Sequence, residues 1–379
     1  MKKLFGFLIV LIFLISCGGG GGGGDGDNSP PKNYATINFN NAAQLGSAIR
    51  DTHGFRVLEN LLQIDIGSGL YSPRSVLDHA QNSIFGYELY NAEPQSSMQT
   101  MGSDTTTEAC ADSGSVHYYS TWDGPNNPVN CSEVQNPKLR IVFDNCWIGL
   151  EKLDGELTIY LPGSDLCSMC PSPMEISTNN LHYLLLKPNT ELEVGTTFID
   201  LIINASSIQC NTNGNLKSMN LTGNGQVSSF EEGVNYYLVF NNFGGSYKGM
   251  TWNELNELIS LIVTVNGNMW GQIGGNDFNE SYDNLVYKSQ LTTYDSNPVL
   301  EVAIDGDYSA SCVSGWITVN TLENILFPLS EPCPIGGEVK ISGNGSAIFT
   351  FDEDGGVNIS VNNQDQYYIS CEDLPECYQ

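Results

Sequence analysis

The sequence is poor in basic residues and in histidine, and its apolar N-terminal run is short. Lysine and arginine together number 14, against 43 acidic residues, and histidine occurs 4 times. The apolar run covers residues 4–15, which is 12 residues, whereas a helix needs about 20 residues to span a bilayer. An acidic chain of this kind repels phosphate backbones, so nucleic acid is excluded as a partner.

Motifs that would identify an enzyme are also missing. The metalloprotease pattern His-Glu-x-x-His does not occur, and the nearest approach to the Gly-x-Ser-x-Gly elbow, at residues 244–249, is one residue out of register. Many carboxylate pairs could perform acid–base chemistry, but the sequence distinguishes none of them. We therefore predict no catalytic, cofactor-binding or metal-ligating residue. The histidines are interpreted as surface, packing or strand residues: His53, His79, His117 and His182.

The N-terminus has the layout of an export signal. Lys2 and Lys3 form a basic region ahead of the apolar run, which has the length of a signal-peptide core. The sequence Leu-Ile-Ser-Cys at residues 14–17 resembles the lipobox of bacterial lipoproteins. That resemblance implies removal of residues 1–16 and attachment of a diacylglycerol, with acyl chains such as palmitate, to Cys17. The alternative is an ordinary secretory signal with a chance cysteine.

Residues 17–32 form a polar tether between this anchor and the rest of the chain. Glycine occupies every position from 18 to 24, and a flexible coil of this length reaches about 20–24 Å. Two or more acyl chains hold a protein stably on a membrane without crossing it. We therefore expect a lipid-anchored protein of the bacterial cell envelope. In the lipoproteins that the signal resembles, an Asp directly after the cysteine signals retention in the inner membrane, so Gly18 favours the outer membrane.

The acidity of the mature chain has two interpretations. Removal of residues 1–16 leaves 12 basic residues against 43 acidic ones, a formal net charge of −31. The first interpretation is that the acidic surface keeps the protein soluble and prevents unwanted association. Calcium is an alternative cofactor, because this hard cation prefers carboxylate and carbonyl oxygens. The candidates are Asp305 and Asp307 on either side of Gly306, and the acidic turn at residues 352–355, although neither completes the spacing of a known calcium loop.

Ten cysteines remain besides Cys17, and an even number in an exported chain predicts disulfides. The pair Cys167 and Cys170 has the Cys-x-x-Cys spacing of redox and zinc sites. Pro171 and Pro173 prevent the helix that a redox site needs, and no second pair has zinc spacing, so a structural disulfide is favoured. The connectivity stays open. The candidates are Cys110, Cys131, Cys146, Cys167, Cys170, Cys210, Cys312, Cys333, Cys371 and Cys377.

Two hydrophobic periods divide the mature chain. In residues 33–100 the period is helical: Asn40 or Asn41 can cap a helix over residues 42–49, and Ser72 with Pro73 can begin a second one. From residue 101 to residue 379 apolar and polar residues alternate, which predicts strands. The predicted fold is therefore mainly β, a large antiparallel sheet arranged as a sandwich or a curled half-barrel, in one domain or two packed halves, after a small helical segment.

Five dipeptides of the type that tight hairpin turns prefer separate the expected strands. The stretch at residues 221–225 also resembles residues 341–345, either through duplication or because hairpin chemistry recurs. We predict a turn at each dipeptide: Asp154-Gly155, Asn224-Gly225, Asn266-Gly267, Asn344-Gly345 and Asp354-Gly355.

Four short stretches of the chain carry a family resemblance. They are residues 40–45, Cys110 with Ser113 and Gly114, residues 143–146 (Phe-Asp-Asn-Cys) with 153–155, and residues 315–319 (Gly-Trp-Ile-Thr-Val) with 336–337. Together they resemble a family of uncharacterised bacterial lipoproteins. The resemblance implies an exported, β-rich protein and transfers no catalytic residue.

The leading functional hypothesis is a non-catalytic envelope lipoprotein whose β domain binds an unknown ligand or an envelope protein. The alternatives are an envelope glycan hydrolase with paired carboxylates and a purely structural surface lipoprotein. Aromatic residues could form a sugar-stacking platform, although core packing is the simpler role for each tryptophan. The five tryptophans are Trp122, Trp147, Trp252, Trp270 and Trp316.

Overall fold

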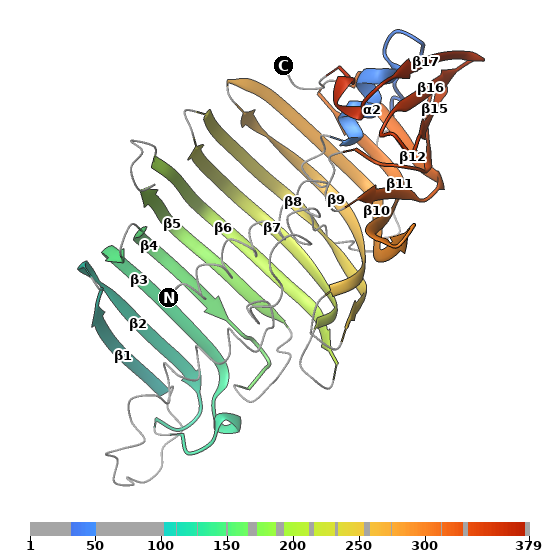
Figure 1. Ribbon diagram of the computed structural model, residues 1–379. Coiled ribbons are helices and arrows are strands. Elements are labelled where there is room, and N and C mark those ends of the chain that lie inside the picture. The colour runs from blue at the N-terminus through green and yellow to red at the C-terminus, as the bar shows by residue number, and fades with distance from the viewer. Residues whose placement is uncertain are drawn as a thin grey trace. The chain divides into compact units, whose positions relative to one another are not determined.

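The computed structural model describes most of the chain from residue 32 onward (Figure 1). The described residues are 32–50, 102–110, 112–126, 128–148, 151–165, 173–186, 193–211, 216–231, 234–253, 258–273, 275–311, 313–328 and 333–375. Cys17, the predicted second helix at residues 72–84, and both His53 and His79 lie outside these ranges.

The described residues form one α-helix, two short 3-10 helices and 17 strands. The elements are α2 (Ala42–Arg50), β1 (Gly102–Ala109), β2 (Ser113–Asp123), η2 (Cys131–Glu133), β3 (Gln135–Ile148), β4 (Glu151–Tyr160), β5 (Met174–Leu186), β6 (Glu193–Cys210), β7 (Leu216–Glu231), β8 (Val234–Trp252), β9 (Leu258–Ile273), β10 (Asn276–Tyr294), β11 (Asn297–Ala310), β12 (Trp316–Glu323), β13 (Ile325–Pro328), β14 (Glu338–Gly343), β15 (Gly345–Phe351), β16 (Val357–Val361), β17 (Gln364–Tyr368) and η3 (Cys371–Asp373).

The predicted fold class is confirmed: the protein is mainly β, with one large antiparallel sheet that is not closed and one small helix before it. The chain divides into two compact units. The described part of unit 1 is residues 102–241 and 271–275, and that of unit 2 is residues 32–50, 242–270 and 276–375. In unit 1 strands β1 to β7 pair with their neighbours in chain order. In unit 2 strand β11 pairs with β10, β12 and β13, and β14 to β17 follow from β12.

The predicted first helix is present as α2. Its apolar face is buried at Ala42, Ala43 and Leu45, which are the first positions of the expected apolar stripe. The helix packs closely on β15, because a Cβ added at Gly46 would lie 2.3 Å from Cε1 of Phe349. A helix of 9 residues is too short to be stable alone in water, so this packing supports it.

Alternation along the strands supplies the core of each unit. In unit 1 Leu139, Ile141 and Phe143 of β3 are buried, and Leu157 and Ile159 of β4 face them in register. In unit 2 Val357, Ile359 and Val361 of β16 are buried while the residues between them are partly exposed. The burial of alternate residues in these strands agrees with the alternation predicted for residues 101–379.

Many long strands are interrupted by a paired bulge in which an Asn or Asp on one strand faces a glycine on the next. Asn180 of β5 has φ 45° and Gly155 of β4 has φ 106°, and the register of β4 and β5 shifts between Asp154 and Glu156. A Cβ at Gly155 would lie 2.1 Å from the carbonyl oxygen of Asn180. Glycine is therefore required on one strand, and Asn or Asp tolerates the left-handed conformation on the other. We call this arrangement the Asx–Gly bulge.

The Asx–Gly bulge recurs in both units. The other pairs with a positive φ on both residues are Asn145 with Gly114, Asp200 with Gly225, Asn242 with Gly267, and Asn284 with Gly306. In two cases the Asn of one bulge also bonds the residue that precedes the glycine of a neighbouring bulge: Asn145 N donates to Oδ1 of Asp154, which precedes Gly155, at 3.2 Å, and Asn284 N donates to Oδ1 of Asn266, which precedes Gly267, at 2.7 Å. Such bulges bend strands and increase their twist.

Three of the five hairpin-turn predictions are wrong for this reason. The dipeptides at residues 154–155, 224–225 and 266–267 lie inside β4, β7 and β9, where their glycines form Asx–Gly bulges. The two remaining predictions are confirmed, since residues 344–345 connect β14 to β15 and residues 354–355 lie between β15 and β16.

Candidate functional site

The candidate site is a hollow of about 290 Å³ on one face of unit 2. Its lining comes from β8 to β11 and from the residue that separates β12 from β13. The lining residues are Gly249, Ser260, Leu261, Ile262, Lys288, Ser289, Gln290, Glu301, Ala303 and Asn324. We refer to these residues as the hollow.

The register of β10 and β11 explains which side chains reach the hollow. Lys288 faces Ala303, and Gln290 faces Glu301, so these four side chains share one face of the sheet. Ser289, the residue between the first two on β10, is buried and belongs to the opposite face by alternation. The short side chain of Ala303 leaves a depression that the longer neighbours surround.

Small residues on β8 and β9 continue the depression. Gly249 has no side chain, and an added Cβ there would lie 3.5 Å from Cδ1 of Ile262. Ile262 is 37% exposed and is the main apolar surface on this side. Ser260 donates to the carbonyl oxygen of Gly249 at 3.0 Å, and its Oγ lies 2.7 Å from Thr251 Oγ1.

The charged side chains of the hollow already have internal partners. Glu301 accepts a hydrogen bond from the amide of Asn324, and Lys288 Nζ lies 3.5 Å from Asp305 Oδ2. The amide of Gln290 makes no hydrogen bond within the described ranges. The hollow contains one carboxyl group, that of Glu301, whereas acid–base cleavage of glycosides uses two.

A second polar cluster lies where the tether reaches unit 2. Lys32 Nζ is 2.5 Å from both Asp283 Oδ2 and Asp307 Oδ2, and it lies 4.7 Å from the centre of the Trp316 ring. Thr318 Oγ1 donates to the other carboxylate oxygen of Asp307 at 2.6 Å. Burial opposes the charge of Lys32, but the hydrogen bonds to both aspartates outweigh it and raise the pKa of this lysine. The tether therefore ends in an ion-pair cluster.

Residues 33–37 then bind along unit 2 as an extended segment, which we call the strap. Trp316 N donates to Asn33 O and Ala35 N donates to Trp316 O, each at 2.8 Å. Further along, Asn344 N donates to Ala35 O at 2.8 Å, and the Asn344 side chain donates to Tyr34 O at 2.9 Å. The sequence interpretation placed Lys32 in a featureless tether and residues 33–41 in a helical segment, and it missed the strap.

Glycines make room for the strap. A Cβ added at Gly315 would lie 2.6 Å from Asn33 O, one at Gly343 would lie 2.4 Å from Ala35 O, and one at Gly345 would lie 2.5 Å from Ile37 O. Contacts below 3.0 Å with backbone atoms cannot be relieved by rotating a side chain. The Gly-Trp and Asn-Gly sequences at these positions are therefore explained by the close passage of residues 33–37.

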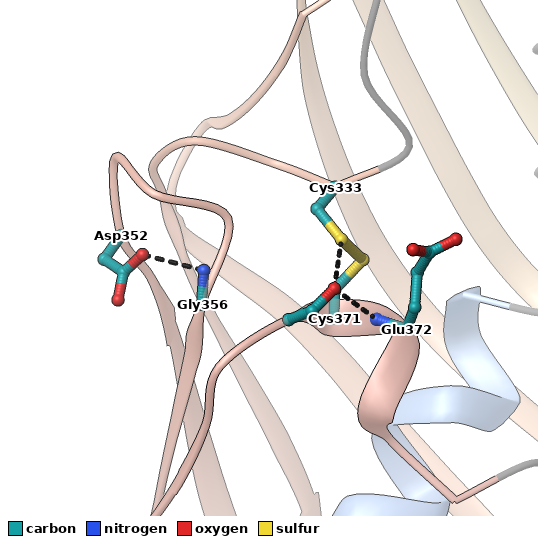
Figure 2. Close-up of a disulfide and its surroundings, with 6 residues drawn as sticks. Cys333, Asp352, Gly356, Cys371 and Glu372 are labelled. Atoms are coloured by element: carbon teal, nitrogen blue, oxygen red, sulfur yellow. Dashed lines mark hydrogen bonds between the residues drawn. A yellow bond between two sulfur atoms is a disulfide. The ribbon is translucent and has the colours of Figure 1, made fainter.

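The two candidate calcium sites have other roles in the structure. The carboxylate of Asp307 bonds Lys32 and Thr318, and Asp305 Oδ1 accepts from Thr321 N at 3.1 Å. In the second candidate, Asp352 Oδ1 accepts from Gly356 N at 2.7 Å (Figure 2). Within the described ranges, no three His, Cys, Asp or Glu side chains gather as a metal ligand set.

Asp352 organises the turn between β15 and β16. Its Oδ2 accepts from Tyr367 Oη at 2.8 Å, and its Oδ1 also accepts from Asp354 N at 3.1 Å. The bond from Tyr367, supported by the backbone N–H groups of Gly356 and Asp354, outweighs burial and lowers the pKa of Asp352. The acidic turn is thus stabilised by Tyr367 of β17 and by its own backbone.

Six of the ten cysteines are disulfide-bonded in the described ranges. Cys110 pairs with Cys146, directly after the Asx–Gly bulge at Asn145, with Cα atoms 5.5 Å apart. Cys333 pairs with Cys371, with Cα atoms 5.6 Å apart (Figure 2). Ser370 Oγ lies 3.4 Å from Cys333 Sγ. Cys131 and Cys210 are also disulfide-bonded. The other candidates lie outside the described residues: Cys167, Cys170, Cys312 and Cys377.

The remaining sequence candidates do not join the hollow. His117 and His182 lie in β2 and β5, as expected for strand residues, and bond Thr107 and Thr197. The near-elbow at residues 244–249 lies inside β8, so it forms no strand-to-helix turn. No tryptophan lines the hollow.

In the part of the chain that the structure describes, no helix combines the length and apolar character that a bilayer span requires. Comparison with protein-family models, with curated proteins and with solved structures found no match for this chain.

Proposed function

We propose that this chain is a lipid-anchored lipoprotein of the bacterial cell envelope that binds a ligand through its β domain without catalysing a reaction. The observation that carries the binding role is the hollow: side chains from several strands converge on it, and only one of them is a carboxyl group. Small-molecule sites are concave and place a few polar groups around the ligand. Chemistry with paired carboxylates has no second acid there.

The strap supports the anchoring role. The glycine tether begins at Cys17 and ends at Lys32, where the ion-pair cluster and residues 33–37 fasten it to unit 2. A chain tied at both ends of its tether is suited to display a domain near a bilayer. Disulfides in the described ranges agree with an oxidising compartment. The outer membrane remains the favoured location because Gly18 follows the anchor.

Acyl labelling tests the anchor. The full chain is expressed in a bacterium that processes lipoproteins and is grown with radiolabelled palmitate. We expect label in the membrane-bound wild-type protein, and no label with release into the soluble fraction for Cys17→Ala. Unlabelled wild-type protein, or label that persists in Cys17→Ala, would refute the anchor. Turnover of glycans, peptides or esters by the purified protein would refute the non-catalytic role.

A further inference from the structure

We infer that the hollow binds a neutral saccharide of one or two rings. This inference rests on the ligand-binding role proposed above and names the class of ligand. The volume of about 290 Å³ lies just below the range of pockets for drug-sized molecules, about 300–1,000 Å³. A polymer chain could place only one or two units inside it.

The polar lining suits hydroxyl groups. Gln290 offers an amide with both donor and acceptor atoms, Lys288 offers only donors, and Glu301 offers only acceptors. A sugar hydroxyl both donates and accepts, so one ring can satisfy these different groups together. The unbonded amide of Gln290 lies on the same face as the other two side chains, and it is the group most available to a ligand.

Charge excludes the competing ligand classes. The positive charge of Lys288 is shared with Asp305, and Glu301 is already bonded to Asn324. A zwitterion such as a free amino acid would have to displace both internal bonds. The mature chain carries a formal charge of −31, which repels acidic glycans over a Debye length of about 8–10 Å. Only neutral polar ligands avoid both the displacement of these internal bonds and the charge repulsion.

The apolar part of the hollow is small, and its position allows one face of a sugar ring to rest on it. Ile262 is 37% exposed beside Gly249, so the C–H face of a sugar ring can rest on one aliphatic side chain. A lipid or an aromatic ligand would need a larger apolar wall, because its binding energy grows with the apolar area that it buries. The other exposed members of the lining are polar or small.

The test uses the full lipidated chain in a detergent without a sugar head group. Saturation-transfer NMR and calorimetry are run with N-acetylglucosamine, its β-1,4-linked disaccharide and maltose, with glucuronic acid and leucine as charged probes. A shallow polar site of this size supports dissociation constants of about 0.1–3 mM, so probes are added to about 20 mM. We expect at least one neutral saccharide to bind in this range, and the charged probes to bind more weakly.

Three variants locate the binding. Gln290→Ala should weaken it by about tenfold through lost hydrogen bonds, and Ala303→Leu should abolish it by filling the hollow. Gln209→Ala removes an exposed glutamine of β6 in unit 1 and should leave it unchanged. Each variant is compared with the wild type by near-UV circular dichroism to confirm that the fold is retained.

The outcomes separate this inference from the proposed function. If no neutral saccharide binds, or if its dissociation constant is the same in Gln290→Ala and Ala303→Leu as in the wild type, the inference is wrong. If only glucuronic acid or leucine binds, and Ala303→Leu abolishes that binding, the saccharide class is wrong although the ligand-binding role stands. Failure of the palmitate labelling, with saccharide binding intact, would refute only the lipid anchor.

Discussion

Replacement of Gly306 by alanine is the sharpest test of the Asx–Gly bulge. Gly306 of β11 has φ 134°, a region that residues with a Cβ rarely adopt. The added Cβ would lie 2.3 Å from the carbonyl oxygen of Asn284 and 2.6 Å from the Cα of Leu285. Both atoms belong to the backbone of β10, so the strand itself would have to move.

The expected loss of stability has two parts. A strained φ costs about 1–3 kcal/mol, and forcing extra volume into a packed site costs about 1–3 kcal/mol. Alanine recovers about 0.4–1 kcal/mol by restricting the unfolded chain. Taking the middle of these ranges, we expect Gly306→Ala to lower the free energy of unfolding by about 3 kcal/mol. With a urea m-value of about 3 kcal/mol/M, the midpoint falls by about 1 M.

Two glycines of unit 2 serve as controls. Gly249 has φ 61° but would make only ordinary contacts through an added Cβ, and Gly336 has neither a positive φ nor a close backbone neighbour. Gly249→Ala should lower the free energy of unfolding by about 1 kcal/mol, and Gly336→Ala should change it by about 0. Urea unfolding followed by tryptophan fluorescence compares the three variants. A midpoint for Gly306→Ala equal to that of Gly249→Ala would refute the steric explanation of the bulge.

Three further predictions concern the disulfide, the acidic turn and the core of unit 2. Replacing Cys333 and Cys371 by alanine opens a loop whose ends are 38 residues apart and should lower the free energy of unfolding by about 4 kcal/mol, measured by urea unfolding. Because the folded pKa of Asp352 is lowered, its stabilisation is complete above the ordinary aspartate value of about 3.9 and disappears as the pH falls through the folded value. Asp352→Asn should therefore reduce the urea midpoint at pH about 6, and its difference from the wild type should shrink near pH 3; an equal difference at both values would contradict this. Tyr308→Phe removes the hydroxyl that donates at 3.1 Å to the fully buried Glu280 and should destabilise the protein by about 1–3 kcal/mol in the same assay; an unchanged midpoint would contradict a role for this bond.

Short-range patterns predicted much of the secondary structure. The apolar stripe of residues 42–49 correctly predicted α2, and alternation correctly predicted strands such as β4 and β16. Both signals depend on residues within about one turn or one strand of each other. The Asn41 side chain does not act as the expected cap in the bonds it makes, which are with Asn38 N and Thr36 O. The cysteine count indicated disulfides, but the partners could not be read because pairing depends on the fold.

The hairpin predictions failed for a specific physical reason. A tight turn and an Asx–Gly bulge make the same local demand, a residue that accepts a positive φ. Asn266-Gly267 in β9 and Asn344-Gly345 after β14 are the same dipeptide in these two roles. What distinguishes them is the strand pairing: Asn266-Gly267 lies within β9, with Gly267 against Asn242 of β8, whereas Gly343 pairs with Gly345, so the chain reverses there. That pairing cannot be read from the dipeptide itself.

The hollow and the strap could not be predicted from the sequence because both depend on contacts between residues far apart in the chain. The hollow combines Gly249 with Asn324, and the strap joins Tyr34 to Asn344 across 310 positions. No periodicity reports such pairings. The glycines at 315, 343 and 345 are the part of the strap's docking site that the sequence shows. Each lies where the backbone of the strap would come within 3 Å of an added Cβ.

The strap also fixes an order of events during synthesis. Residues 33–37 are among the early parts of the chain to be made, but their hydrogen-bonding partners at Trp316 and Asn344 follow about 300 residues later. At about 5–20 residues per second, translation alone separates them by roughly 15–60 s. During that interval the native docking site for residues 33–37 does not exist. The segment nearest the proposed anchor is thus fastened to the fold only after about 300 further residues have been made.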